Sequence, residues 1–501
     1  MDAQRQVVLS IDQGTTNTKC VLVTATGDRV ATGSASAGLT SPRPGWVEQD
    51  AERIWASVLA ATAEALAAAG RQHAVAAVAL STQRESVVAW RASTGEPVGP
   101  VIGWQDSRSA DWCRVHLDRA AGEEVARRTG LRVDAMFSAP KVRWVLDHLP
   151  VGVPVADVRV GTVESWLVWR LSGGRDHLAE AGNASRTLLY DIARLDWSEP
   201  LLDVFGIPRS VLPDVRASDD GFGTCFGVRG IPDGTPVSAV LADSHAALFG
   251  QSCTEPGMAK ATYGTGASVM TPVAALTGAS SAVPTTLAWL VEGRPTYALE
   301  GNILSCGATL AWTAGLLTDG RVDRLVELAA TVPDAGGVTL VPAFTGLGAP
   351  HWDRDATASI TGFTTGATAA HVARAALESV SHQVADVVDV IEAQAGPLRT
   401  LRADGGVTAA ELVMQDQSDL LDRVVEVLDV ADVSALGAAR LAWQTLGRAD
   451  AWASPPVRRR YTPQHTEPAR HRRRARWMAE VRRACSPTTT SASTGDPLPE
   501  A

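Results

Sequence analysis

The stretch Ser10-Ile11-Asp12-Gln13-Gly14-Thr15-Thr16-Asn17-Thr18-Lys19 lies between two apolar runs at residues 7–9 and 21–23. This pattern predicts a strand, a tight polar turn and a second strand. The turn region combines a carboxylate, a glycine, two hydroxyls and a cation. A loop that handles phosphate needs such groups, because a carboxylate orients hydrated Mg²⁺, a bare backbone permits close approach, and hydroxyls and cations donate to oxyanions. The loop alone is equally compatible with an ordinary hairpin.

Length and composition limit the classes of protein that fit. A chain of 501 residues with 45% hydrophobic residues predicts two large domains or one duplicated fold. The net charge of -10 argues against nucleic acid as the main partner. The six cysteines show no metal-like spacing, which indicates free thiols in a reducing compartment. No leader pattern and no bilayer-length apolar run is present, so we expect a cytoplasmic protein without membrane contact.

Strand and helix patterns alternate, and the second half repeats the first. Strands are expected at residues 7–11, 19–23, 29–35 and 74–80, with an amphipathic helix between Asp50 and Gly70. Strands at residues 258–262 and 268–271 flank a second turn, Tyr263-Gly264-Thr265-Gly266-Ala267. One glycine-threonine hairpin in each half predicts an α/β protein of two related domains that face a shared cleft.

The predicted domains cover residues 1–250 and 251–455, with the boundary where Gly, Ser, Pro and Glu interrupt the pattern near residues 250–257. The remaining residues 456–501 begin with arginine-rich segments. Such a segment can be a basic patch for a polyanion, but it is more often the solvated face of a helix. The last stretch, residues 486–501, is rich in Pro, Ser and Thr and is expected to be disordered.

Two predicted strands of the N-terminal half end in side chains suited to a polyol. Arg84 and Glu85 follow the strand at residues 76–80, and ligands bind at the carboxyl ends of strands in open α/β sheets. The guanidinium can donate to hydroxyl oxygens and the carboxylate can accept hydroxyl protons. Trp104 follows the strand at residues 101–103 and can cover the carbon side of a polyol. The alternatives are a surface ion pair for Arg84 and Glu85, and core packing for Trp104.

Two further strand ends carry chemistry. Asp243 follows the strand at residues 236–241 and precedes a helix, where it can accept the proton of an attacking hydroxyl and help to orient Mg²⁺. Its alternative role is an ordinary N-cap. Gly405 and Gly406 follow Asp404 at a junction between a strand and a helix, where free N–H groups and bare backbone suit a nucleotide.

The order of these motifs resembles the FGGY family of carbohydrate kinases, and within it the glycerol-phosphorylating members most of all. Residues 136–148 fit one family signature throughout. Residues 358–378 fit the second, except that Phe363 stands where a smaller aliphatic residue is usual. Further similar segments begin at Pro44, Asn183 and Pro342, and the resemblance extends from about residue 7 to about residue 443.

The resemblance implies two ribonuclease-H-like (actin-like ATPase) domains around a central cleft that holds ATP and Mg²⁺. It makes Asp243 the general base and places Asp12 and Asp243 at the metal. The implied nucleotide-binding residues are Gly14, Thr15, Thr16, Lys19, Gly264, Thr265, Gly405 and Gly406. The implied acceptor-binding residues are Arg84, Glu85, Trp104, Met136, Asp243, Ser244 and Ser268. The partner expected is a small polyol or sugar, and a homodimer or homotetramer is expected in solution.

The chain departs from its glycerol-phosphorylating relatives at three acceptor positions. Those proteins carry tyrosine where this chain has Met136, glutamine where it has Ser244, and phenylalanine where it has Ser268. A pocket without that phenol, amide and ring should bind glycerol poorly. We therefore expect a larger polyol, such as a tetritol or pentitol, or a ketose, with glycerol itself as the alternative.

A second class of function is an actin-like ATPase without a small-molecule acceptor. Such a protein would not need Arg84, Glu85, Trp104 and Asp243 together. This set of residues therefore favours the kinase.

Overall fold

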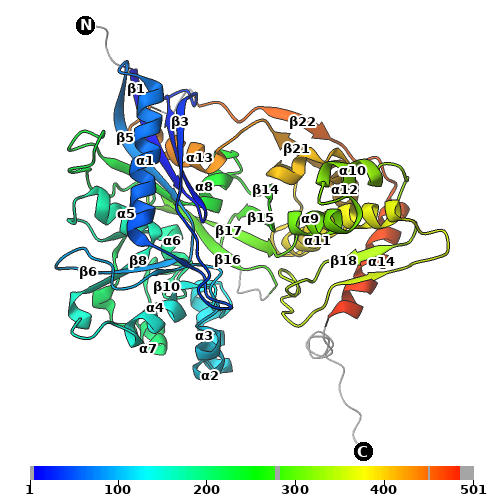
Figure 1. Ribbon diagram of the computed structural model, residues 1–501, viewed down its shortest axis with the longest axis horizontal. Helices are drawn as coiled ribbons and strands as arrows, with labels where there is room; N and C mark the ends of the chain where they lie inside the picture. Colours follow the sequence, from blue (N-terminus) through cyan, green and yellow to red (C-terminus); the bar gives the residue numbers. More distant parts are fainter. Residues whose placement is uncertain (1–4, 277–281, 449–451, 486–501) are drawn as a thin grey trace, which may run out of the picture.

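The structure is a computed structural model in which residues 5–276, 282–448 and 452–485 are described. Two large mixed sheets, one in each half of the chain, organise it (Figure 1). The first sheet has the order β13-β5-β1-β2-β3. Strand β1 pairs antiparallel with β2 and parallel with β5, which pairs parallel with β13. The bounds are Arg5–Gln13 for β1, Asn17–Val23 for β2, Arg29–Ser36 for β3, His73–Thr82 for β5 and Val237–Ala242 for β13.

The second sheet has the order β16-β17-β15-β14-β20-β21-β22. Its strands are β14 (Met258–Tyr263), β15 (Ala267–Val273), β16 (Thr285–Val291), β17 (Arg294–Ile303), β20 (Thr400–Asp404), β21 (Val424–Leu428) and β22 (Val457–Tyr461). The hairpins β14–β15 and β15–β17 are antiparallel, whereas β14–β20 and β20–β21 are parallel. This repeats the connectivity of the first sheet and confirms the prediction of two ribonuclease-H-like domains.

Helices cover both sheets. Helix α1 (Ala51–Ala69) packs on β2 and β3, and it begins as predicted at Asp50, whose side chain accepts from the Arg53 N–H. The other helices that frame the sheets are α8 (Asp243–Gly250), α9 (Gly307–Leu317), α10 (Val322–Ala329), α11 (Ala369–Ala395), α12 (Glu411–Leu421), α13 (Val433–Thr445) and the 3₁₀ helix η3 (Gly406–Ala409).

Helix α13 joins the two halves, because it lies between β21 and β22 of the second sheet in sequence but packs on the first sheet. It contacts β1, β5 and β13 and lies against α8. The Ser10 hydroxyl donates to the Ala435 carbonyl at 2.6 Å, and the Trp443 indole donates to the Val23 carbonyl at 3.1 Å. A methyl group on Gly437 would lie 1.9 Å from the Ala246 carbonyl oxygen, so the two helices need glycine there to approach closely.

An insertion in the N-terminal half supplies part of the acceptor side. A four-stranded sheet contains β4 (Glu48–Gln49), β7 (Val101–Ile102), β6 (Val87–Arg91) and β8 (Val158–Thr162). Around it are α2 (Ala110–His116), α3 (Arg119–Thr129), α4 (Ser138–Asp147), α5 (Val163–Leu171), α6 (Ala181–Ser185) and α7 (Glu199–Phe205). Three two-stranded sheets complete the fold: β9 (Leu178–Glu180) with β12 (Asp214–Arg216), β10 (Tyr190–Asp191) with β11 (Asp196–Trp197), and β18 (Thr339–Val341) with β19 (Ser359–Thr361).

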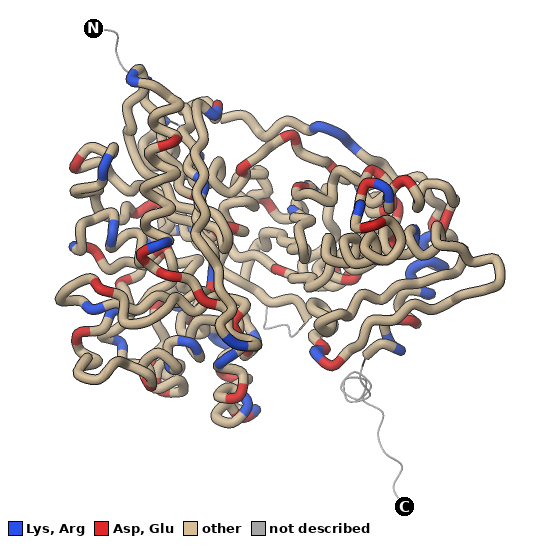
Figure 2. The backbone as a smooth tube through the Cα atoms, viewed as in Figure 1, with Lys and Arg blue, Asp and Glu red and all other residues tan. Residues whose placement is uncertain are grey.

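The arginine-rich segment forms a helix, α14 (Glu467–Ala484), at the far side of the second half (Figure 2). Its central arginines are used inside the protein. Arg473 lies 2.6 Å from Asp416 on α12, and Arg474 lies 2.6 Å from Asp386 on α11. Trp477 is buried and donates to the same Asp386. This face of the helix packs against α11 and α12, whereas Arg472, Arg476 and Arg482 are exposed, as expected for the solvated face of a helix. The expected disorder of residues 486–501 lies outside the described residues.

All six cysteines are free thiols, as predicted, and all but Cys485 are buried. Among the helices in the described part of the chain, none is long and apolar enough to cross a bilayer.

Candidate active site

The first glycine-threonine turn lies between β1 and β2, at the same sheet edge as the end of β5. Asp12 faces Lys19 across the hairpin and Ser81 across the parallel pair. The Ser81 hydroxyl donates to Asp12 Oδ1 at 2.8 Å. Burial raises the pKa of Asp12 to about 7, and the nearby Asp243 carboxylate contributes to this rise. A bound cation would offset the repulsion that Asp12 receives from Asp243.

The tip of this turn contacts the acceptor side. The Trp104 indole N–H donates to the Thr15 hydroxyl at 2.9 Å, and its backbone N–H donates to the Ser86 hydroxyl at 3.1 Å. Trp104 therefore links the two regions that the sequence analysis assigned to phosphate and to polyol. Thr16 is exposed beside it.

Lys19 makes a contact that the sequence does not predict. Its ammonium lies 2.9 Å from Asp432, the residue before α13, and Arg29 lies 3.2 Å from the same carboxylate. The Lys19 side chain remains 48% exposed. Asp432 thus holds the cation at the mouth of the turn and ties α13 to the first sheet.

The second glycine-threonine turn borders a hollow of about 750 Å³. Gly264 and Thr265 line one side, Gly406 and Val407 another, and Leu310 on α9 a third. Helices α9 and α10 close this hollow with Gly307, Ala308, Ala311, Val322 and Val326. The resemblance to the family placed Ala311 near the adenine, whereas the other four residues were not predicted. The lining is mostly apolar, as a site for a flat aromatic base requires.

Gly405 and Gly406 have different roles. Gly405 has φ 95°, and a methyl group there would lie 2.4 Å from the Tyr263 carbonyl oxygen. Gly406 has no atom within 4 Å of such a methyl group. Gly405 is therefore needed for the fold, whereas Gly406 leaves space at the edge of the hollow.

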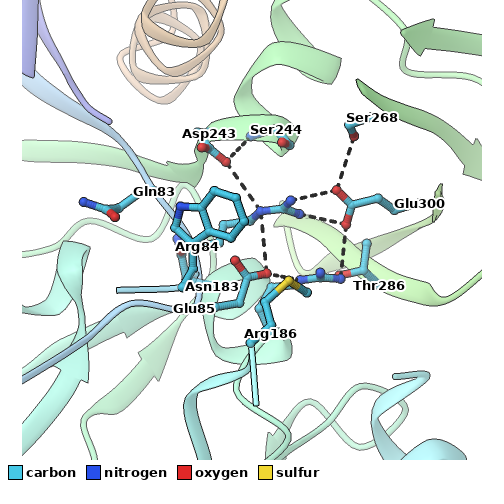
Figure 3. A network of polar contacts seen from close by, with 12 residues as sticks. Gln83, Arg84, Glu85, Asn183, Arg186, Asp243, Ser244, Ser268, Thr286 and Glu300 are labelled. Atoms are coloured by element: carbon cyan, nitrogen blue, oxygen red, sulfur yellow. Dashed lines mark hydrogen bonds and ion pairs between the residues drawn. The ribbon is translucent and has the colours of Figure 1, made fainter. Parts of the chain in front are cut away.

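The predicted acceptor residues gather where β5 and β13 end (Figure 3). Arg84 and Glu85 follow β5, and Asp243 is the first residue of α8, directly after β13. Arg84 Nε lies 3.4 Å from Asp243 Oδ1 and 3.8 Å from Glu85 Oε1. Asp243 is 39% exposed and accepts from the Ser244 backbone N–H at 2.6 Å. Desolvation raises the pKa of Asp243, and Arg84 opposes this effect.

Glu85 is held in an unusual backbone conformation, with φ 62°. The buried Lys141 ammonium donates to the Glu85 carbonyl at 3.3 Å and also to the Met136 carbonyl, and the Ser138 hydroxyl donates to Glu85 at 3.1 Å. Burial lowers the pKa of Lys141 to about 7. A positive φ on a residue other than glycine persists only where its surroundings enforce it, and here α4 supplies the enforcing donors.

The three departures from the relatives lie at the same place. Met136 and Ser244 are partly buried. The Met136 carbonyl accepts from the same Lys141 ammonium as the Glu85 carbonyl, and Ser244 lies next to Asp243 (Figure 3). Ser268 lies on β15, and its hydroxyl donates weakly, at 3.4 Å, to Glu300 of β17. The structure thus brings together every residue that the sequence analysis assigned to the acceptor.

Glu300 and Arg186 were not identified from the sequence. Arg84 donates to both oxygens of Glu300, at 2.8 and 2.7 Å, and Arg186 donates to Glu85 at 2.7 Å (Figure 3). The available signal was a lone charged residue in the apolar strand sequence Tyr297-Ala298-Leu299-Glu300. Such a residue needs a buried partner, but the sequence does not say which one.

The carboxylates at this site suit Mg²⁺, which needs few protein ligands, better than a metal ion whose ligands all come from the protein. Among the described residues, no group of three or more His, Cys, Asp and Glu side chains could hold a metal ion. Asp12 and Asp243 provide two carboxylates instead. Mg²⁺ usually takes one or two carboxylates and completes its shell with water and phosphate oxygens, so two are sufficient beside a nucleotide.

Known proteins match both halves of the chain. The N-terminal domain of the FGGY family of carbohydrate kinases matches residues 7–250, and the C-terminal domain of that family matches residues 259–445. A glycerol kinase from Chromobacterium violaceum is 43% identical over 88% of this chain and 90% of its own length. A glycerol kinase from Alkalilimnicola ehrlichii is 42% identical over 96% of this chain and 98% of its own.

Solved structures match as well. The Plasmodium falciparum glycerol kinase with ADP has a TM-score of 0.90 at 28% identity, and the match covers 96% of this chain and 98% of that one. A xylulose kinase from Rhodospirillum rubrum has a TM-score of 0.84 at 26% identity, covering 95% and 98%. The chain therefore belongs to the FGGY family of carbohydrate kinases, and with it to the ATP-dependent phosphotransferases.

Proposed function

We propose that the chain transfers the γ-phosphoryl group of ATP to a terminal hydroxyl of a small polyol, with Asp243 as the general base. The observation that supports this most is the position of Asp243. Its carboxylate lies at the end of β13, 3.4 Å from Arg84, and is near enough to Asp12 to raise the pKa of that carboxyl. A base at this position can reach an acceptor held by Arg84 and Glu85.

In the proposed reaction, Asp243 takes the proton of the acceptor hydroxyl. The hydroxyl oxygen bonds to the γ-phosphorus, and the bond from that phosphorus to the bridging oxygen of ADP breaks. Arg84 donates to acceptor oxygens, Glu85 accepts from acceptor hydroxyls, and Trp104 covers the carbon side. Met136, Ser244 and Ser268 form the remaining walls.

The donor side is formed by both glycine-threonine turns. We assign Gly14, Thr15, Thr16 and Lys19 to the terminal phosphates, together with Gly264 and Thr265. We assign Gly405 and Gly406 to the adenosine, and Gly406 lines the 750 Å³ hollow. Mg²⁺, held by Asp12 and Asp243, would neutralise charge on the transferred phosphoryl group.

Two acceptors deserve separate tests. Glycerol is the first candidate, because the glycerol kinases named above are 42–43% identical to nearly the whole chain. A tetritol, a pentitol or a ketose is the second candidate. Met136, Ser244 and Ser268 stand where the glycerol-phosphorylating members of the family usually carry larger or more polar side chains. The same changes predict that longer acceptors are used at a rate closer to that of glycerol than in a glycerol-specific pocket.

The test is a coupled ADP-release assay with glycerol, erythritol, threitol, xylitol, ribulose and xylulose, with the product identified by mass. We expect at least one polyol to accelerate ADP release and to carry the phosphate. Polyol-independent hydrolysis of ATP would instead indicate an actin-like ATPase without an acceptor. A strong preference for glycerol over all longer polyols would contradict the second candidate alone.

We also propose that the chain is divided into residues 1–250, 251–455 and 456–501, and that it forms a homodimer or homotetramer. The six free thiols support a cytoplasmic location.

A further inference from the structure

Arg84 is the predicted acceptor-binding cation, yet its strongest contacts are with another protein group. Its two terminal nitrogens donate to the two oxygens of Glu300, at 2.8 and 2.7 Å. Such a bidentate pair fixes both the position and the plane of a guanidinium. The Nε edge of Arg84 is left facing Asp243 and Glu85, at 3.4 and 3.8 Å.

Glu300 reaches this site from the other half of the molecule. It lies on β17 of the second sheet, 216 residues from Arg84, and its side chain is 0% exposed. Figure 3 shows its carboxylate pointing from that sheet toward the end of β5. The orientation of an acceptor-binding group in the first half is therefore set by a carboxylate of the second half.

A second arginine closes the arrangement into a ring of alternating charges. Arg186 lies 3.1 Å from Glu300 and 2.7 Å from Glu85, and Glu85 in turn faces Arg84. The four side chains Arg84, Glu300, Arg186 and Glu85 are all at least nine-tenths buried. Each charge in the ring has two neighbours of opposite sign, so the position of each depends on the others.

We infer that Glu300 is a positioning residue for the acceptor, which it serves by fixing the position and plane of the Arg84 guanidinium. This inference rests on the proposed function. Without the Glu300 carboxylate, Arg186 would keep its ion pair with Glu85, and Arg84 would keep only its Nε contacts with Glu85 and Asp243. The terminal nitrogens of Arg84 would then be free to turn toward those two carboxylates, which are the groups that have to accept hydroxyl protons from the acceptor.

The test compares Glu300→Gln with Glu426→Gln. Glu426 is a matched control, because it lies on the same sheet, is 10% exposed and pairs with two arginines, Arg402 at 3.3 Å and Arg460 at 2.6 Å. Glu300→Gln should raise the KM of the acceptor roughly 10- to 100-fold, as expected when a charged hydrogen bond is misplaced, with the KM of ATP changed less than about twofold. Glu426→Gln should lower the Tm but leave both KM values unchanged.

Two further variants keep the result decisive. Glu300→Asp retains the charge on a shorter side chain, so it should fold if Glu300→Gln does not and should raise the acceptor KM by a smaller factor. Arg84→Gln separates this inference from the proposed function. An acceptor KM that rises in Arg84→Gln but stays at the wild-type value in both Glu300 variants overturns the inference alone. If Arg84→Gln also has no effect, the proposed acceptor site is wrong.

Discussion

Single residues at the acceptor site are held by donors that never touch the acceptor. Lys141 is the main example, because one ammonium group serves the carbonyls of both Glu85 and Met136. Both carbonyls belong to residues that we assign to the acceptor pocket. The geometry of the pocket therefore depends on a buried amine from α4.

Lys141→Met should raise the KM of the acceptor and lower the free energy of unfolding by about 2 kcal/mol or more, because the Met136 carbonyl loses the ammonium and the Glu85 carbonyl loses one of its two side-chain donors. Steady-state kinetics and denaturant unfolding measure the two effects. Ser138→Ala is the control, since it removes only one of the two donors to Glu85 and should have a smaller effect. Equal effects of the two variants would contradict the bridging role of Lys141.

Glu164 should make stability depend on pH. This buried carboxyl on α5 has its pKa raised by desolvation from 4.5 to about 8. Between these values the unfolded chain loses the proton and the folded protein keeps it, so stability is greatest at low pH and falls as the pH rises toward 8, by up to about 1.4 kcal/mol per pH unit. Unfolding measured from pH 5 to 8 should show a shallower slope in Glu164→Gln. An unchanged slope would contradict the assignment.

The sequence predicted those site residues that stand at strand ends. Asp12, Arg84, Glu85 and Asp243 each follow a recognisable apolar run, so local pattern was enough. Glu300 lies within such a run and gives no comparable signal. Its partner Arg84 is 216 residues away, and only the folded chain shows that they meet.

At the scale of elements, the two glycine-threonine hairpins occupy equivalent positions, because the two sheets repeat the same order of strands. The bounds of the hairpins and of α1 were predicted well because their signals are local. Apolar runs mark the strands, and Asp50 and Gly70 mark the two ends of α1. Apart from Ala311, which the family resemblance placed near the adenine, the α9 and α10 walls of the nucleotide hollow were not predicted. They line it through small and aliphatic side chains, which look like ordinary core residues in a sequence.

Gly405→Ala and Gly406→Ala should separate fold from nucleotide binding. Gly405→Ala puts a methyl group 2.4 Å from a backbone oxygen at φ 95°, so it should lower the Tm strongly. Gly406→Ala meets nothing within 4 Å in the protein and should keep the wild-type Tm. Its methyl group would take space beside the adenosine, so the KM of ATP should rise. A wild-type KM for ATP in Gly406→Ala would contradict the placement of the nucleotide.

At the scale of the whole molecule, the two halves are joined by three features around the site. Helix α13 crosses onto the first sheet, Asp432 pairs with Lys19, and Glu300 pairs with Arg84. The internal repeat could be predicted from the sequence, since each half carries its own hairpin. The crossing of α13 could not, because its apolar face would pack equally well on either sheet.

The central claim is that Asp243 removes the proton from a polyol hydroxyl as phosphoryl transfer from ATP proceeds. The most direct measurement is single-turnover transfer from γ-labelled ATP to the best acceptor of the panel, in the wild type and in Asp243→Asn. The account predicts label on the polyol in the wild type. In Asp243→Asn the rate should fall roughly 10²- to 10⁴-fold, the usual contribution of a general base, while acceptor and ATP still bind. Transfer at the wild-type rate in Asp243→Asn would contradict it.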